Sequence, residues 1–222
     1  VSTAWRAFYD WPDSYARYIH YIFSRYHAHN CILSPIHYDW TRMSILSRDY
    51  NEPASLVLER DGPLPFGTLL SANANGSTLL NFGQPPWLSL HQVGNWRDHH
   101  SHWLLTDVHQ RTDPPQPVLN GEPYYAGWSD YEGWPDYEGW DKDDFVGGTE
   151  ADDAACRSAM YGSFLSGGLA GHIYGAQGLW GGDIEPESAY TMWDALQWRS
   201  GAQLQHLRTF ALLEGDRYKN LI

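Results

Sequence analysis

Glu122 and Asp39 are the residues whose type and placement point most clearly to chemistry. Glu122 ends the short apolar run "PVLNGE", and the aromatic stretch "PYYAGW" follows at once. Asp39 ends a second run, "CILSPIHYD", and lies between Tyr38 and Trp40. Two carboxyl groups held together can divide the roles of proton donor and ionised nucleophile. The alternative for either acid is to cap a loop or to pair with an arginine at a rim.

Short apolar runs alternate with segments of helical periodicity along the chain. The runs that predict strands cover residues 31–36, 67–72, 87–92, 117–121 and 169–173. The segments that predict helices cover residues 12–28, 96–111, 151–167, 187–199 and 201–213. Strands that alternate with helices predict parallel β/α units, in which helices cover both faces of the sheet.

Polar residues gather where the predicted strands end. In a (β/α)8 barrel the active site is built from the C-terminal ends of the strands and the loops after them, whereas chance would scatter polar residues over both ends. The sequence therefore predicts an α/β fold of the TIM-barrel type, with a site at the strand ends. The residues at these ends are Asp39, Asn73, Gln92, Asn95, Glu122 and His172.

Three segments resemble the apiosidase-like glycoside hydrolases, a (β/α)8 family. "QPVLNGEPYYAG" is similar to that family's strand-seven signature, N-G-E-P-x-Y-E, and "SGGLAGHIYGAQGLW" is similar to its strand-eight segment. "WLSLHQVGN" resembles the strand-six segment W-L-x-x-x-x-Q-S-G-H. The order and spacing agree from the first helix to residue 213. The resemblance implies that this chain holds strands four to eight of an incomplete barrel.

The same resemblance implies a function and two catalytic residues. Glu122 takes the position of the family's nucleophile, and Asp39, closing strand four, that of its acid/base. A glycosidic bond breaks through an oxocarbenium-like state, so one carboxylic acid protonates the leaving oxygen while a carboxylate attacks or stabilises the anomeric carbon. We therefore expect a glycosidase of the retaining type that acts on plant or microbial polysaccharide and needs no cofactor.

Departures from the family pattern keep an alternative open. Asn73 and Asn95 stand where the family tends to have histidines, and Ala126 stands where a second glutamate is expected. A catalytically inactive barrel that binds carbohydrate, or serves as a structural subunit of an extracellular assembly, would keep the aromatic residues without needing two convergent acids.

Further residues near the strand ends are candidates for holding sugar. Flat rings stack on the apolar faces of sugars, and polar side chains can bind hydroxyl groups. For each of them, packing or ordinary loop capping is the alternative. The candidate substrate-binding residues are His172, Gln92, Asn95, Asn73, Tyr124, Tyr125, Trp128 and Tyr174.

Residues 1–222 are predicted to be the C-terminal part of a single TIM-barrel catalytic domain, and the loop at residues 126–151 is predicted to be an acidic, aromatic insertion in it. This loop contains the repeat "GWSDYE" and "GWPDYE". Its end, "DKDDFVGGTEADD", offers oxygen ligands for calcium but lacks a spaced loop motif, so a solvated acidic face is favoured. The histidines in "DHHSH" at 98–102 belong to no HExxH pattern, and we predict no metal.

Composition limits the partners and the location. The net charge is -13, with no Lys/Arg stretch to follow a phosphate backbone, and the apolar runs are too short to span a bilayer. We expect neither a nucleic-acid partner nor a membrane span. The sequon Asn75-Gly76-Ser77 is compatible with secretion, to an extracellular or periplasmic location. Cys31 and Cys156 form no disulfide framework, and free, buried thiols are expected.

Five strands cannot close a barrel that requires eight. Two open edges would expose unpaired backbone groups and apolar side chains. We therefore expect strands one to three to come from another chain, or from a part of the same polypeptide that was cleaved off or lies outside these 222 residues. The edge at strand four should contact that partner, besides the carbohydrate substrate bound at the strand ends.

Overall fold

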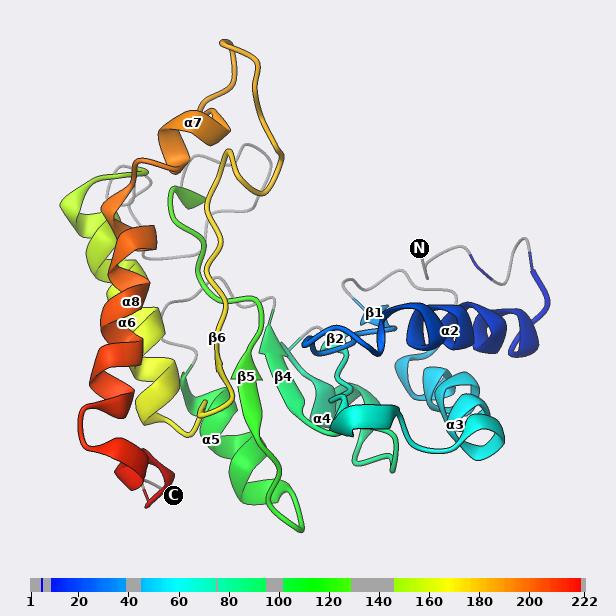
Figure 1. Cartoon of the computed structure of the whole chain (residues 1–222). Helices are drawn as coiled ribbons and strands as arrows, with labels where there is room; N and C mark the ends of the chain where they lie inside the picture. Colours follow the sequence, from blue (N-terminus) through cyan, green and yellow to red (C-terminus); the bar gives the residue numbers. More distant parts are fainter. Residues whose placement is uncertain are drawn as a thin grey trace. The chain divides into compact units, whose positions relative to one another are not determined.

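The computed structural model describes residue 5 and residues 9–38, 45–74, 76–94, 102–128 and 146–220. These residues form an α/β fold of short strands and longer helices (Figure 1). The chain divides into two compact units. Unit 1 comprises Val1–Asn95 and Asp107–Gly121, and unit 2 comprises Trp96–Thr106 and Glu122–Ile222.

Two helices of unit 1 lie side by side (Figure 1). Helix α2 spans Asp13–Tyr26 and buries residues four positions apart, which places their side chains on one face of the helix. Helix α3 spans Asn51–Asp61 and ends at Gly62, whose φ of 79° is accessible to glycine at little cost. Short 3-10 turns precede and follow α3, at Ser47–Tyr50 and Pro65–Gly67.

The strands of unit 1 are short and mostly parallel. Strand β1 (His37–Tyr38) pairs in parallel with β2 (Asn73–Ala74), and β4 (His91–Gly94) pairs in parallel with β5 (Val118–Asn120). Strand β3 (Gly76–Ser77) runs antiparallel to β4. Helix α4 (Thr78–Phe82) follows β3 directly, and the Ser77 side chain caps it by accepting a hydrogen bond from Leu80 N at 3.2 Å.

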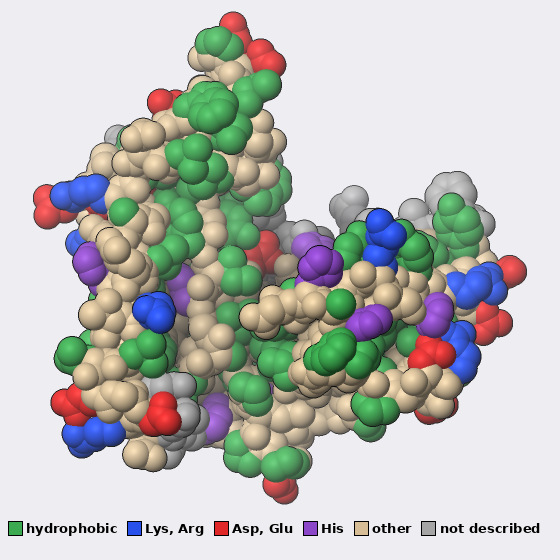
Figure 2. All heavy atoms as spheres, in the orientation of Figure 1, with side chains coloured by type: hydrophobic (Ala, Val, Ile, Leu, Met, Phe, Trp, Pro, Cys, Tyr) green, Lys and Arg blue, Asp and Glu red, His purple; other side chains and the backbone are tan. Residues whose placement is uncertain are grey.

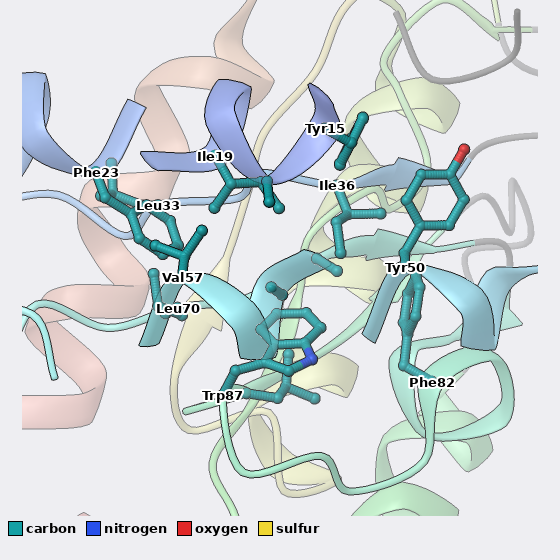
Figure 3. Close-up of a cluster of buried hydrophobic side chains, with 14 of the residues drawn as sticks. Tyr15, Ile19, Phe23, Leu33, Ile36, Tyr50, Val57, Leu70, Phe82 and Trp87 are labelled. Carbon is teal, nitrogen blue, oxygen red and sulfur yellow. The ribbon is translucent and has the colours of Figure 1, made fainter. Parts of the chain in front are cut away.

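The core of unit 1 joins the first helix to the strands and to the 3-10 turn before α3. Figure 3 shows Ile19 of α2 near Ile36, with Tyr50 and Trp87 from later segments in the same cluster. Polar atoms at the edge of the cluster are satisfied: Trp87 Nε1 donates to Asn51 Oδ1 at 3.0 Å, and the Tyr15 hydroxyl donates to the Pro35 carbonyl at 2.9 Å.

Unit 2 contains β6 (Gly171–His172) and a pair of packed helices, α6 (Glu150–Leu165) and α8 (Arg199–Leu212). The two helices lie side by side in Figure 1. The rings of Tyr161 on α6 and Phe210 on α8 meet edge to face, with centroids 5.6 Å apart. The short helix α7 spans Met192–Ala195, and the turn η5 spans Gly215–Asn220. Helix α5, His102–Arg111, begins in unit 2 and ends in unit 1.

The predicted elements occur in the predicted order, but α3 and α4 were not predicted, the helix predicted at 187–199 is present only as α7 and the first residue of α8, and the strand positions differ. The run predicted at 67–72 contributes one bridge, between Leu70 and Leu33, while the ladder forms just after it, in β2. The antiparallel pair of β3 with β4 was not predicted. The expectation of buried thiols is right for Cys156 and wrong for Cys31, which is exposed; both are free. Within the described residues, no helix is long and apolar enough to cross a bilayer.

Candidate functional site

Gln92 lies on β4 in unit 1 and is nearly buried, with 8% of its surface exposed. Its Nε2 donates to Ser71 Oγ at 3.0 Å, and the Ser71 hydroxyl in turn donates to the Leu90 carbonyl at 3.0 Å. The amide oxygen of Gln92 faces Gly121: a Cβ built on Gly121 would stand 2.1 Å from this oxygen. Gln92, predicted to bind substrate, is thus packed against the residue that precedes Glu122.

A backbone hydrogen bond also holds the end of β5. Gly121 N donates to the Val93 carbonyl at 2.9 Å, so the ladder between β4 and β5 extends to the residue before Glu122. A side chain at position 121 would meet the amide of Gln92, which would have to move away from Ser71 to make room. The sequence shows the order Asn120-Gly121-Glu122, but it does not show which residue Gly121 contacts.

A buried pair beside Gln92 was missed by sequence reasoning. Thr78 Oγ1 lies 2.6 Å from His91 Nδ1 and accepts a hydrogen bond from Gln92 N at 3.1 Å. His91 is fully buried, and this burial lowers the pKa of its imidazole, an effect that the Gln116 side chain opposes. His91 is therefore a neutral framework residue that helps to hold β4.

The remaining strand-end positions of unit 1 are only partly described. Asn73 is half-buried on β2, opposite His37 in the register. Asp39 and Asn95 lie outside the described residues, as do residues 98–101 and 129–145 of the histidine and aromatic segments. The separation of the Asp39 and Glu122 carboxyl groups therefore stays a prediction.

Glu122 opens unit 2 and is half-buried. The segment that follows is fixed by three kinds of contact. Tyr124 is 3% exposed, and its hydroxyl donates to Asp152 Oδ1 at 2.7 Å. Gly127 N donates to the same oxygen at 2.8 Å. Between them, Ala126 bridges in parallel to Ala176, with Ala126 N donating to the Gly175 carbonyl at 3.0 Å.

Tyr125 and Trp128 form the aromatic pair of this segment. Their rings meet edge to face, with centroids 5.9 Å apart, and both side chains are half-buried. The Tyr125 ring lies against Gly175, where a Cβ would stand 2.3 Å from the ring. This close approach requires glycine at 175, and it fixes Tyr125 beside the stretch that carries Tyr174. The pair keeps partly exposed ring surface that can stack on a sugar.

His172 and Tyr174 lie on β6 and just after it. Both are half-buried. The Tyr174 hydroxyl and Ser200 Oγ are 3.0 Å apart and share a hydrogen bond. Burial raises the pKa of Tyr174 to about 12, which keeps its hydroxyl protonated at neutral pH. The structure thus brings Tyr124, Tyr125, Trp128 and Tyr174 into one unit with Glu122 and His172.

Ala126, where the family pattern has a second glutamate, is fully buried in the apolar cluster of unit 2. Its neighbours there include Ala155, Ala159 and Ala176. A carboxylate on a longer side chain would enter this apolar surrounding, which is costly for a charged group. The departure at position 126 therefore agrees with how this segment is packed.

Charged groups form no metal-binding cluster of three or more His, Cys, Asp or Glu side chains within the described ranges. On the face shown in Figure 2, Lys and Arg side chains stand singly or in small groups among carboxylates. Among the site residues described above, the groups available for chemistry are the Glu122 carboxylate, the His172 imidazole, hydroxyls, amides and aromatic rings.

The solved structures that share this fold include two glycoside hydrolases. One is a glycoside hydrolase family 5 protein from Bacteroides vulgatus, with 15% identity and a TM-score of 0.63, covering 89% of this chain and 44% of that one. The other is described as a glycoside hydrolase, with 16% identity and a TM-score of 0.60, covering 90% of this chain and 46% of that one. The chain thus spans less than half the length of either structure, and at these identities the likeness concerns the fold alone.

The sequence identifies the family more closely than the fold does. Residues 3–215 match the apiosidase-like family, catalytic domain. This chain therefore belongs to the apiosidase-like family, as its N-G-E-P-x-Y and G-H-x-Y-G segments predicted. No curated protein sequence matches it.

Proposed function

We propose that this chain is the C-terminal part of a (β/α)8 glycoside hydrolase that cleaves a glycosidic bond in plant or microbial polysaccharide. One observation carries the proposal: Glu122 follows β5 directly, after a glycine that Gln92 and the ladder hold in place, in a chain of the apiosidase-like family. Catalytic acids of such barrels stand at the C-terminal ends of strands.

In the proposed mechanism Glu122 attacks the anomeric carbon as a carboxylate, and Asp39 protonates the leaving oxygen. A retaining enzyme holds such a pair about 5 to 5.5 Å apart, and the acid then activates the water that releases the covalent sugar. Glu122 must be ionised for this role, and Asp39 must be protonated, which requires different surroundings for the two groups.

The aromatic and polar residues of unit 2 are proposed to hold the sugar. Tyr125 and Trp128 offer half-buried rings for stacking, and His172 offers a polar side chain from β6. Tyr124 and Gln92 have a different role in this proposal. Both are nearly buried and bonded to protein groups, so Gln92 supports Gly121, and Tyr124 supports the segment after Glu122.

A second function is favoured by specific residues. Asn73 replaces a histidine expected from the family, and position 126 is a buried alanine that leaves no place for a second glutamate. An inactive carbohydrate-binding or structural subunit would tolerate both changes. It would keep the Tyr125–Trp128 pair and bind glycans without releasing sugar.

We further propose that the remaining barrel strands lie in another chain or another part of the polypeptide, and that the protein acts outside the cell or in the periplasm. The coverage of 44% and 46% of the similar structures supports the first point. The test is co-purification of the natural protein from its source, followed by mass spectrometry of whatever chain accompanies residues 1–222.

The experiment that tests the activity is a screen of sugar release from a panel of plant and microbial glycans by the full-length protein. Release from one class of glycan supports the hydrolase. Binding to a glycan without any release, measured by calorimetry on the same panel, supports the inactive subunit instead.

A further inference from the structure

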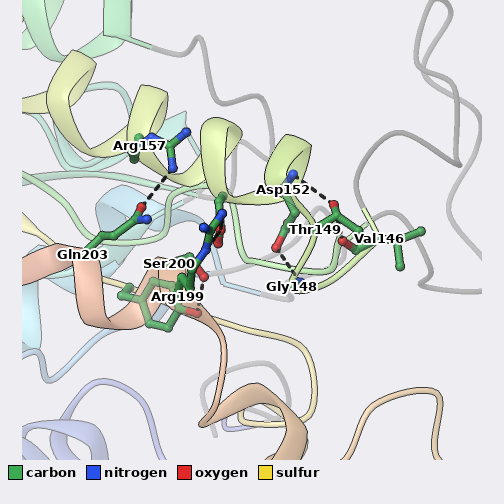
Figure 4. Close-up of polar contacts among 10 residues, drawn as sticks. Val146, Gly148, Thr149, Asp152, Arg157, Arg199, Ser200 and Gln203 are labelled. Atoms are coloured by element: carbon green, nitrogen blue, oxygen red, sulfur yellow. Dashed lines mark hydrogen bonds and ion pairs between the residues drawn. The ribbon is translucent and has the colours of Figure 1, made fainter.

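One buried carboxylate, Asp152, joins two segments that lie far apart in the sequence. It stands in the first turn of α6 with none of its surface exposed. Its Oδ1 accepts hydrogen bonds from the Tyr124 hydroxyl and Gly127 N, and its Oδ2 accepts one from Gly148 N at 3.2 Å. Figure 4 shows the contact with Gly148. We call these four residues the Asp152 clamp.

Trp198 and Tyr190 also contact the glycines of the clamp and their neighbour Gly147. The indole of Trp198 packs on Gly127, Gly147 and Gly148, where added Cβ atoms would stand 2.8, 2.4 and 2.8 Å from it. Tyr190 meets Trp198 edge to face at 5.0 Å and accepts a hydrogen bond from Gly147 N at 2.9 Å. Glycines are thus needed on both sides of residues 128–146, because the indole fills the space of their side chains.

The clamp and a neighbouring bridge hold three positions of the segment after Glu122. Asp152 holds residues 124 and 127, and the bridge to Ala176 holds residue 126 between them. Tyr125 and Trp128, the two half-buried rings, are each the next residue after one that Asp152 binds. Their directions therefore depend on a carboxylate that itself reaches no solvent.

Burial and hydrogen bonding act in opposite directions on the pKa of Asp152. Burial raises the pKa of Asp152, and the hydrogen bonds from Gly127, Tyr124 and Gly148 oppose that effect by favouring the carboxylate. Burial also raises the pKa of Tyr124, so its hydroxyl stays a donor. Three donors on one buried carboxylate leave it well satisfied, and removing its charge leaves a donor without an acceptor.

We propose that Asp152 is a positioning residue that sets the Tyr125–Trp128 pair for sugar and thereby determines the affinity of the site, without taking part in bond cleavage. This inference rests on the proposed function only in taking the ligand to be a carbohydrate. It goes beyond that function by assigning affinity and chemistry to different carboxylates, Asp152 and Glu122.

The test compares Asp152→Asn with a matched control, Asp153→Asn. The asparagine has one acceptor oxygen for donors that lie on both carboxylate oxygens, so its NH2 group meets either Gly148 N or Gly127 N, and the hydrogen bonding that joins the segment after Glu122 to Gly148 is broken in both cases. Asp153 is the next residue of α6, is equally buried, and binds Arg199 at 2.8 Å instead of the segment after Glu122. Both variants lose a buried carboxylate, but only Asp152 binds the segment that carries Tyr125 and Trp128.

The measurements are steady-state kinetics on a glycan cleaved by the wild-type protein, glycan binding followed by tryptophan fluorescence, and amide hydrogen exchange of residues 122–128. For Asp152→Asn we expect KM and the dissociation constant to rise about tenfold, kcat to stay within about threefold, and exchange at 122–128 to accelerate. For Asp153→Asn we expect KM and that exchange to stay within about twofold of wild type.

Equal KM and equal exchange in the two variants would overturn the inference, as would a loss of kcat with KM unchanged. A wild-type protein that binds glycan without cleaving it would refute the proposed hydrolase alone, and the ratio of dissociation constants would then decide on Asp152. A protein that binds no glycan of the panel would refute both.

Discussion

The amide oxygen of Gln92 occupies the space in which a side chain on Gly121 would begin. A Cβ at position 121 would stand 2.1 Å from Gln92 Oε1 and 2.9 Å from Gln92 Cδ. Gln92 cannot turn aside without breaking its hydrogen bond to Ser71 Oγ, which measures 3.0 Å. The residue before Glu122 is therefore fixed by packing, by a hydrogen-bonded neighbour, and by the ladder between β4 and β5.

Gly121→Ala should destabilise the protein by about 2 kcal/mol and lower its Tm by roughly 4–8 °C, because the methyl group displaces Gln92 from Ser71. Thermal unfolding followed by circular dichroism checks the size of the effect. The double variant Gly121→Ala/Gln92→Ala should be nearly as stable as Gln92→Ala alone, because the new methyl group then has no amide to displace. An additive double variant would show that Gly121 is needed for another reason.

The two thiols should react very differently. Cys31 is exposed, whereas Cys156 is buried, and this burial raises the pKa of its thiol. In the folded protein we expect a maleimide to label Cys31 alone, with Cys156 reacting at least about 100-fold more slowly until denaturant is added. Peptide mass spectrometry of briefly labelled protein gives the ratio directly. Fast labelling of Cys156 would contradict its placement on the inner face of α6.

His91 should make stability depend on pH. Its pKa is lowered in the folded state, below the ordinary value of 6.5, so folding disfavours the imidazolium. The stabilisation is thus fully present above pH 6.5 and is lost as pH falls through the folded pKa. His91→Asn should be less stable than wild type at pH 7.5, and the gap should shrink at pH 5. Melting curves of both proteins at the two pH values test this, and a constant gap would rule it out.

Much of the fold followed from local pattern. The helical periodicity of residues 12–28 predicted α2, and its buried residues include Tyr15, Ile19 and Phe23, because a helix brings every fourth residue to one side. Short apolar runs predicted the parallel pairing of β4 with β5. The strand positions were predicted less accurately, because a strand of two residues, such as β2, is too short to show an alternating pattern of apolar residues. Helix α3 was missed although Gly62 marks its end.

The supporting residues of the site could not be read from sequence, because their contacts join distant segments. Tyr124 looked like a substrate-binding aromatic, but its hydroxyl meets Asp152, which is 28 positions away. Gln92 looked like a polar strand tip, but its amide is bound to Ser71. Local sequence gives the chemical type of such residues, whereas only the packed structure shows whether they face ligand or framework.

Glu122→Gln tests the central claim most directly. The substitution removes the charge and hardly changes the shape, and Glu187→Gln, at an exposed position of the same unit, is the matched control. On a glycan that the wild-type protein cleaves, we predict that Glu122→Gln lowers kcat by at least about 1000-fold, leaves glycan binding measurable by calorimetry, and that the control matches wild type. Turnover by Glu122→Gln equal to that of wild type would contradict the account and remove Glu122 from the mechanism.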